Sequence, residues 1–238
     1  MIRAAHIEEH AASAWPASHT VRDAGWLLRH TPGVGKRRNN SALPVAETLP
    51  VEAAEEYYRS RGLPVTIQIS PAEQHTELDE ELAARGYRHD APTLVLTAPV
   101  PAVAADARVE IGDITPAWRA AYGNDAVTTH VLDRITRPAG FASVNVDGEV
   151  AALGLFVAGD GLAGVFCMAT APAHRRRGHA AAILRAGAAW SADQGAGLLY
   201  LQVEEDNIPA LRLYEGVGFT HSHSYHYRVR DGWPEPVA

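Results

Sequence analysis

Val165-Phe166-Cys167-Met168-Ala169-Thr170, a short turn, and then Arg175-Arg176-Arg177-Gly178-His179-Ala180 form the stretch from which the fold of this chain can be inferred. The first run predicts a strand, and the Ala/Ile/Leu-rich residues after the second predict a helix. A glycine lets backbone N–H groups crowd round a ligand, and the helix dipole places partial positive charge at the same end. Arginines add bidentate donors. The stretch therefore predicts a diphosphate site; a solvated basic turn before an ordinary helix is the alternative.

A second stretch follows in a similar strand-to-helix context. The expected strand at 198–203 leads to a helix, and there the chain resembles the GCN5-related N-acetyltransferase (GNAT) superfamily over about residues 140–230. The acetyl-CoA loop pattern of that superfamily, Arg/Gln-x-x-Gly-x-Gly/Ala, is matched by Arg175, Gly178 and Ala180. Its second pattern, Asn-x-x-Ala-x-x-x-Tyr-x-x-x-Gly-Phe, is matched by Asn207, Ala210, Tyr214, Gly218 and Phe219.

The resemblance implies an α/β (α+β) fold with a mixed central sheet flanked by helices. Acetyl-CoA is then the cosubstrate, held where the parallel strands 165–170 and 198–203 splay apart, because unpaired backbone groups need partners. A backbone N–H near Met168 is expected to face the thioester oxygen as an oxyanion hole. The residues expected to bind acetyl-CoA are Met168, Ala169, Thr170, Arg175, Arg176, Arg177, Gly178, His179, Ala180, Asn207 and Tyr214.

The resemblance also implies direct attack of an amine on the thioester. Tyr214 matches the tyrosine that protonates the departing CoA thiolate, with a packed core aromatic as the alternative. Asn207 is expected to cap a helix and to touch CoA. Gly35-Lys36 lacks the Ser/Thr of a phosphate-binding P-loop, since Arg37 follows; Lys36, Arg37 and Arg38 are either a solvated hairpin or an anion contact.

The general base is less evident. Many relatives have a glutamate on the strand occupied here by residues 165–170, and others have Leu-Glu-Val where this chain has Leu201-Gln202-Val203. Strand alternation places Tyr200, Gln202 and Glu204 on one face, so Glu204 is the candidate base rather than Glu205. A water relay beside a solvated carboxylate is an equal alternative, and His223 is another possible base.

Composition limits the function further. The 238 residues carry a formal net charge of −7, which argues against nucleic-acid binding and favours a cationic partner. No apolar run is long enough to span a bilayer and no signal peptide is evident, so neither a membrane partner nor export is expected. A single cysteine, Cys167, agrees with a cytoplasmic location. His221 and His223 lack a third ligand at ordinary spacing, so no metal is expected.

The chain is expected to divide at a Pro/Ala connector, residues 98–105. Residues 1–100 would form a degenerate GNAT-like half that shapes acceptor selectivity, and 101–238 the catalytic GNAT domain. The repeated ending of a helix at glycine plus aromatic, Ala83–Tyr87 and Leu213–Phe219, suggests this tandem arrangement. The expected elements are helices at 8–14, 51–61, 78–85, 116–120 and 126–135, and strands at 24–30, 41–46, 64–70, 93–97, 108–111, 142–145, 150–157, 165–170 and 198–203.

The leading hypothesis is an N-acetyltransferase that moves an acetyl group from acetyl-CoA to a primary amine of a small cationic molecule, acting as a monomer or homodimer. One alternative is acetylation of a protein lysine or N-terminal amine. Another is a catalytically silent acyl-CoA sensor, because the strand at 165–170 lacks a glutamate.

Overall fold

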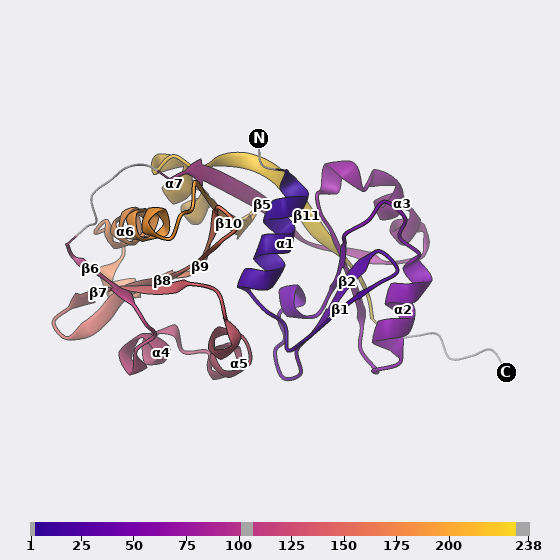
Figure 1. Cartoon of the computed structure of the whole chain (residues 1–238), viewed down its shortest axis with the longest axis horizontal. Coiled ribbons are helices and arrows are strands. Elements are labelled where there is room, and N and C mark those ends of the chain that lie inside the picture. The colour runs from indigo at the N-terminus through magenta and orange to yellow at the C-terminus, as the bar shows by residue number, and fades with distance from the viewer. Residues whose placement is uncertain (1–2, 101–106, 232–238) are drawn as a thin grey trace.

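The computed structural model describes residues 3–100 and 107–231, which form one mixed eleven-stranded sheet with helices on its faces (Figure 1). The expected α/β architecture is confirmed. The strands are β1 (His19–Asp23), β2 (Trp26–His30), β3 (Ala42–Pro44), β4 (Val65–Ile69), β5 (Arg88–Pro99), β6 (Val109–Gly112), β7 (Ala139–Val146), β8 (Glu149–Gly159), β9 (Leu162–Thr170), β10 (Leu198–Glu204) and β11 (Thr220–Arg230). The helices are α1 (Ala4–Ala14), α2 (Val51–Arg59), α3 (Thr76–Ala84), α4 (Pro116–Tyr122), α5 (Asp125–His130), α6 (His179–Asp193) and α7 (Ile208–Gly216).

The order of elements repeats along the chain. β1-β2-β3-α2-β4-α3-β5 in the first part corresponds to β7-β8-β9-α6-β10-α7-β11 in the second. The parallel pair β3/β4 corresponds to the parallel pair β9/β10. A Pro/Ala connector was expected at 98–105, but Ala98 and Pro99 still belong to β5, and 101–106 lie outside the described residues.

The two parts exchange their last strands. The sheet order is β1-β2-β3-β4-β11-β5-β10-β9-β8-β7-β6, so β11 lies between β4 and β5, and β5 lies between β11 and β10. Each strand is antiparallel to both of its neighbours there. The two parts of the chain therefore form a single continuous sheet. In each part, the last strand pairs with a strand of the other part.

Helices cover both faces of the second part. α6 and α7 lie on one side of β7–β10, and α4 and α5 lie on the other (Figure 1). Alternation along β8 explains this arrangement, because Phe156 packs with Ile183 of α6 while Leu155 packs with Trp118 of α4. The Phe156 ring packs against α6 at Gly187, where there is no side chain; a Cβ at this position would lie 1.9 Å from the ring.

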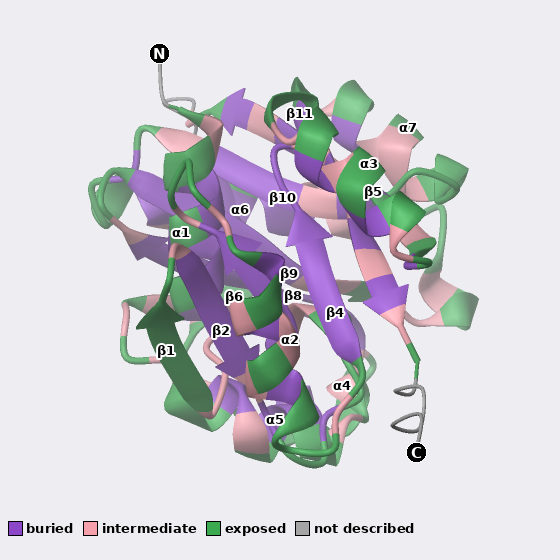
Figure 2. Ribbon diagram, turned by 90° about the vertical axis from the view of Figure 1, so that its right-hand side faces the viewer, coloured by how far each residue is buried: buried purple, intermediate pink, exposed green. Residues whose placement is uncertain are grey.

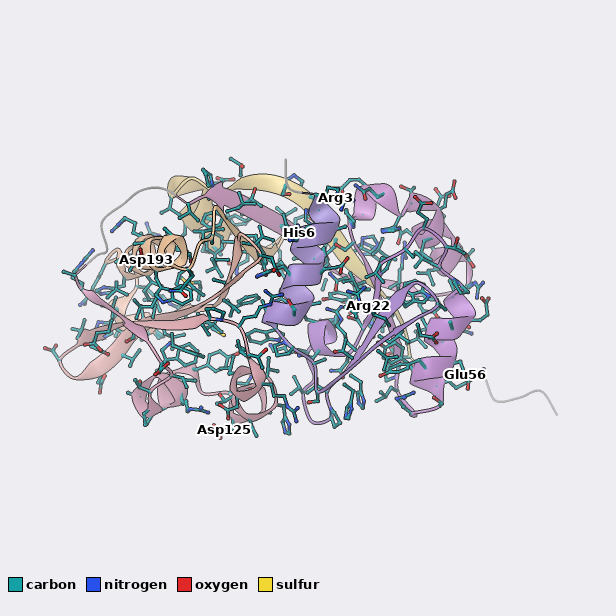
Figure 3. The ribbon with its side chains drawn as sticks, in the orientation of Figure 1. Arg3, His6, Arg22, Glu56, Asp125 and Asp193 are labelled. Carbon is teal, nitrogen blue, oxygen red and sulfur yellow. The ribbon has the colours of Figure 1, made fainter. Side chains whose placement is uncertain are left out.

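The inner strands are buried and one edge is not. Figure 2 shows β4 and much of β10 buried, whereas every residue of β1 is exposed. The charged side chains Glu56 and Asp125 lie at the periphery of the ribbon in Figure 3, and both are exposed.

The β1/β2 hairpin and the helix after α4 differ from expectation. In the segment expected to be a strand at 24–30, Ala24 and Gly25 form a turn, and the strand begins only after it. Strand β1, which precedes this turn, was not predicted, because all of its residues are exposed and show no apolar alternation. The helix expected at 126–135 stops at His130. Val131 leaves the helical conformation (φ −126°, ψ −62°), and a 3₁₀ turn, Leu132–Arg134, follows.

Helix α1 joins the two parts of the molecule, and it crosses between them in Figure 1. His10 Nδ1 is hydrogen-bonded to the Tyr200 hydroxyl of β10 at 2.8 Å, with both side chains buried. Trp15, just after α1, stacks on Phe166 of β9 at 5.4 Å between ring centroids. Its indole N–H donates to Asn39 Oδ1 at 2.9 Å. The N-terminal residues are therefore part of the core beneath β9 and β10.

His10 makes folding stability depend on pH. Burial, assisted by Arg137, lowers the pKa of His10 to about 4, whereas an unfolded histidine has a pKa near 6.5. The contribution to stability is therefore complete above pH 6.5 and is lost as the pH falls toward 4, on the order of 3 kcal/mol in total. Urea unfolding from pH 7 to 4 measures it. His10→Asn should flatten the dependence, and His6→Asn, an exposed control on the same helix, should not. Equal slopes for His10→Asn and wild type would contradict the assignment.

Candidate active site

The parallel strands β9 and β10 separate halfway along their length. They pair from Leu162–Val165 of β9 to Leu198–Leu201 of β10, and the pairing ends there. On its other edge β10 continues to pair with β5 as far as Glu204, which lies opposite Thr93. The edges of β9 and β10 that face each other beyond Val165 thus carry no ladder, as expected from the sequence.

A bulge in β9 shapes one wall of this gap. The register against β8 shifts between Leu153 and Leu155, and Cys167 takes a positive φ of 54°. Gly154 makes room for the displaced residue, since a Cβ there would lie 2.7 Å from the Met168 sulfur.

Beyond the bulge, β9 directs alternate backbone groups into the gap. The Ala171 N–H donates to Ala151 O at 2.9 Å, beside β8. Because backbone groups alternate along an extended chain, those of Met168 and Thr170 point the other way, toward β10. The Thr170 carbonyl accepts a hydrogen bond from Arg175 Nε at 3.3 Å, so its N–H is the group left for a ligand.

The arginine-rich turn, residues 175–178, lies between a 3₁₀ turn (Pro172–His174) that follows β9 and the first residue of α6. Arg176 and Gly178 take positive φ values of 62° and 77°, which close the turn. Residues 175–178 are exposed, and His179 and Ala180 form the first turn of a 15-residue helix. The first N–H groups of a helix have no partner within it, so this end presents donors and a positive dipole.

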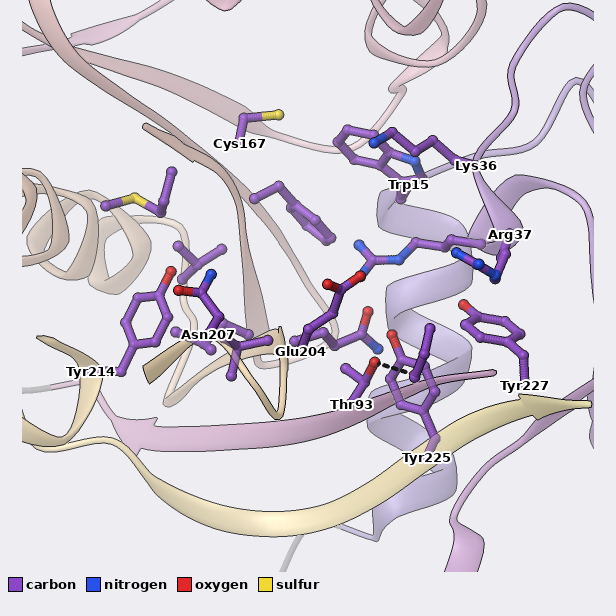
Figure 4. Close-up of a pocket in the computed structure, with 18 of the residues that line it drawn as sticks. Trp15, Lys36, Arg37, Thr93, Cys167, Glu204, Asn207, Tyr214, Tyr225 and Tyr227 are labelled. Atoms are coloured by element: carbon purple, nitrogen blue, oxygen red, sulfur yellow. Dashed lines mark hydrogen bonds between the residues drawn. The ribbon is translucent and has the colours of Figure 1, made fainter. Parts of the chain in front are cut away.

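A cavity of about 510 Å³ occupies the gap (Figure 4). It is lined by Trp15, Gly35, Lys36, Arg37, Arg38, Ala91, Thr93, Tyr122, Val165, Phe166, Cys167, Met168, Leu201, Gln202, Val203, Glu204, Asn207, Tyr214, Tyr225 and Tyr227. Four of the residues that were predicted from the sequence are among them: Met168, Glu204, Asn207 and Tyr214. The others, Ala169, Thr170, Arg175, Arg176, Arg177, Gly178, His179 and Ala180, lie outside this lining, along the end of β9 and the start of α6.

Tyr214 and Asn207 lie together at one end of the cavity (Figure 4). Tyr214 is 8% exposed and packs against Phe219, and burial raises the pKa of its phenol above the ordinary value. Its hydroxyl therefore stays protonated at neutral pH. Asn207 caps α7, since its Oδ1 accepts from the Ala210 N–H at 3.3 Å.

Gln202 and Glu204 lie on the cavity side of β10, and Gln202 is held from behind. Its Nε2 lies 3.5 Å from both carboxylate oxygens of Glu8 on α1, a buried residue. Glu8 also accepts from His223 Nε2 and from Gln68 Nε2, both at 2.9 Å. His223, considered as an alternative base, is thus buried and bound to Glu8, away from the cavity lining. Glu204 is exposed.

The first part of the chain supplies a wall that the motifs did not reveal. Trp15 and the segment Lys36–Arg38 line the cavity, together with Tyr225 and Tyr227 of the exchanged strand β11. Arg38 Cζ lies 6.0 Å from the Trp15 ring centroid and 5.7 Å from that of Phe166. In the sequence, only the basic run at 36–38 indicates this wall, and it is compatible with either a solvated hairpin or an anion contact.

Cys167 faces the same cavity beside Tyr122. Burial raises the pKa of the thiol to about 12, so it is not a nucleophile at neutral pH. Among residues 3–100 and 107–231, no three His, Cys, Asp or Glu side chains are grouped so as to hold a metal ion. Within that same part of the chain, no helix is long and apolar enough to cross a membrane.

The chain is similar in sequence to known acetyltransferases. The family model described as "Probable histone acetyltransferase Rv0428c C-terminal" matches residues 2–228. The uncharacterized N-acetyltransferase YobR of Bacillus subtilis (strain 168) is 27% identical over 247 residues, a match that spans 94% of this chain and 97% of that protein.

Solved structures agree on the fold. A GCN5-related N-acetyltransferase from Kribbella flavida has a TM-score of 0.69 at 17% identity, over 98% of this chain and 97% of its own. A tandem GNAT protein from the clavulanic acid biosynthesis pathway has a TM-score of 0.60 at 16% identity, over 98% and 90% of the two chains. At such identities these likenesses establish a GNAT fold.

Proposed function

Because this chain belongs to the "Probable histone acetyltransferase Rv0428c C-terminal" family, within the GNAT superfamily, we propose that it transfers an acetyl group from acetyl-CoA to the primary amine of a small molecule. The observation that carries the proposal is the gap between β9 and β10, with a cavity inside it and an arginine-rich helix N-terminus at its end. Backbone groups of Met168 and Thr170 would hold an extended amide-containing chain as an added strand does. Residues 175–180 would hold the diphosphate.

Acetyl-CoA supplies the acetyl group as a reactive thioester when bound. The Met168 N–H would face the thioester oxygen and stabilise the negative charge that develops on it. Glu204 would accept the proton that the attacking amine loses, directly or through water. Tyr214 would donate its phenolic proton to the sulfur as the carbon–sulfur bond breaks, since its raised pKa keeps that proton in place.

We further propose that residues 1–100 are a degenerate GNAT-like half that shapes acceptor selectivity, and that 101–238 form the catalytic half. The repeated element order supports this division. In the second half an arginine–glycine turn precedes α6. In the first half the equivalent helix, α2, follows Pro50 and has no such turn before it. Trp15 and Lys36–Arg38 are where this half contacts the cavity.

A protein lysine is the second candidate acceptor, because the matching family is described as a histone acetyltransferase. The cavity lining argues against a basic peptide, since Lys36 and Arg38 would repel it. A small acceptor that enters the cavity fits the lining better.

Release of CoA, measured with a thiol reagent, tests the activity. Wild type should release CoA from acetyl-CoA only when a suitable amine is present. Gly178→Trp should abolish acetyl-CoA binding in calorimetry, because an indole would cover the first N–H groups of α6. Gly195→Trp is the matched control, since Gly195 also has a positive φ and open space around it, at the other end of α6. Intact binding in Gly178→Trp, or tight binding without turnover on any amine, would overturn the proposal.

Removing the phenolic proton tests Tyr214. Tyr214→Phe should lower kcat by roughly 10²–10⁴-fold, the usual contribution of a general acid, and should leave the Kd for acetyl-CoA within about twofold. Steady-state kinetics and calorimetry measure the two quantities. Tyr87→Phe, remote from the cavity, serves as control. An unchanged kcat would leave Tyr214 as a packing residue.

The pH–rate profile tests Glu204. A carboxylate base loses activity as it is protonated, so kcat/KM of wild type should fall on the acid side of the profile, and Glu204→Gln should remove that limb and lower the plateau. Glu205→Gln, the exposed neighbour, is the control. An acid limb that persists in Glu204→Gln would assign the base elsewhere.

A further inference from the structure

The cavity carries a charge opposite to that of the whole chain. The sequence has a net charge of −7, which led to the expectation of a cationic acceptor. Along the cavity, however, Lys36, Arg37 and Arg38 provide three cations, and Glu204 is the one carboxylate among its lining residues. The field that an acceptor meets comes from these near groups, because salt screens charges more than about 10 Å away.

Arg37 and Arg38 differ in whether their charge is already neutralised. Arg37 forms an ion pair with Asp90, with Nη2 and Oδ2 2.6 Å apart. Arg38 has no carboxylate partner within ion-pair distance among the described residues. Its guanidinium lies instead over the rings of Trp15 and Phe166 and interacts with the Tyr225 hydroxyl.

Arg38 is also kept in its charged form. It is half-buried. Burial opposes the charge, but Tyr225, Tyr227 and Glu8 outweigh that effect and raise the pKa of the guanidinium above its ordinary value. A charge withdrawn from water without an ionic partner is costly unless a ligand supplies one. A guanidinium presents paired donors that match the two oxygens of a carboxylate.

Gln202 carries a polar atom without a partner in the described part of the chain. Oε1 of Gln202 is buried without a hydrogen bond among the described residues, although Nε2 of the same amide is oriented by Glu8. An amide oxygen accepts hydrogen bonds and therefore suits the N–H groups of an amine. The cavity residues thus provide a site for an anion at Arg38 and, at Glu204 next to the Gln202 amide, a carboxylate that can accept a hydrogen bond from an amine.

We infer that the acceptor is a small amino acid whose carboxylate binds Arg38 while its amine lies at Glu204, beside the Gln202 amide. This inference rests on the acetyl transfer proposed above, which it narrows to one class of amine. Lys36, also in the lining, adds positive charge, and Arg37 contributes little because Asp90 neutralises it.

Turnover on matched pairs of amines tests the inference. Each of the common L-amino acids is compared with its amide, which keeps the amine and the side chain but removes the negative charge. For the preferred amino acid, kcat/KM should exceed that of its amide by roughly 10–100-fold, the range expected of one charge-assisted hydrogen-bonded pair. Arg38→Met should remove most of this preference, Arg38→Lys should restore part of it, and Arg37→Met should change it least. Phosphoethanolamine, as an anionic amine of another kind, should be a poorer acceptor than the preferred amino acid.

A binding measurement separates failure of this inference from failure of the acetyl-transfer proposal. N-acetyl amino acids, the expected products, are titrated into protein saturated with CoA, and this readout needs no turnover. Wild type should bind the N-acetyl form of the preferred amino acid at least tenfold more tightly than Arg38→Met does. Equal binding of acetyl-CoA by the two proteins would show that the variant is folded. Equal turnover of acids and amides, a better rate with phosphoethanolamine, or equal binding by wild type and Arg38→Met would overturn the inference. Binding without any turnover would support the anion site and sink the transferase proposal alone.

Discussion

The end of the β9/β10 pairing at Val165 and Leu201 is the constraint on which the rest of this structure depends. Parallel strands that remained in register would use all their backbone groups and leave no cavity. The bulge at Cys167, with its positive φ, turns β9 away from β10, and Gly154 accommodates the displaced Met168. The two strands then end beside different helices, α6 and α7, so that the arginine-rich turn, Tyr214 and Glu204 lie around one gap.

The first part of the chain completes this gap. Because β5 pairs with both β10 and β11, and β11 also pairs with β4, the two parts share one sheet and cannot separate without breaking three ladders. Helix α1 adds buried contacts through His10, Glu8 and Trp15. The same exchange brings the segment Lys36–Arg38 to the cavity, so the acceptor side is made by residues far in sequence from the acetyl-CoA motifs. Its basic character, rather than the acidity of the whole chain, governs which acceptor fits.

Local patterns were sufficient to predict some of this structure. The β9–α6 and β10–α7 units, the splayed strands and the Asn207 cap each depend on residues close in sequence, and all were expected. The exchange of β5 and β11 depends on pairing between residues such as Thr93 and Glu204, which no local pattern encodes. The break of the helix at Val131 and the exposed strand β1 were missed because neither carries a distinctive apolar period. The role of Lys36–Arg38 was left open because only tertiary packing places that turn beside Trp15 and Phe166.

A crystal structure of this protein with acetyl-CoA would show whether the cofactor occupies the gap between β9 and β10. We expect the pantetheine chain to lie between β9 and β10 beyond Val165, hydrogen-bonded to the backbone of Met168 and Thr170, with the diphosphate on residues 175–180. Strands that pair along their whole length in the presence of excess acetyl-CoA, or a cofactor bound elsewhere while this gap is filled by side chains, would contradict it.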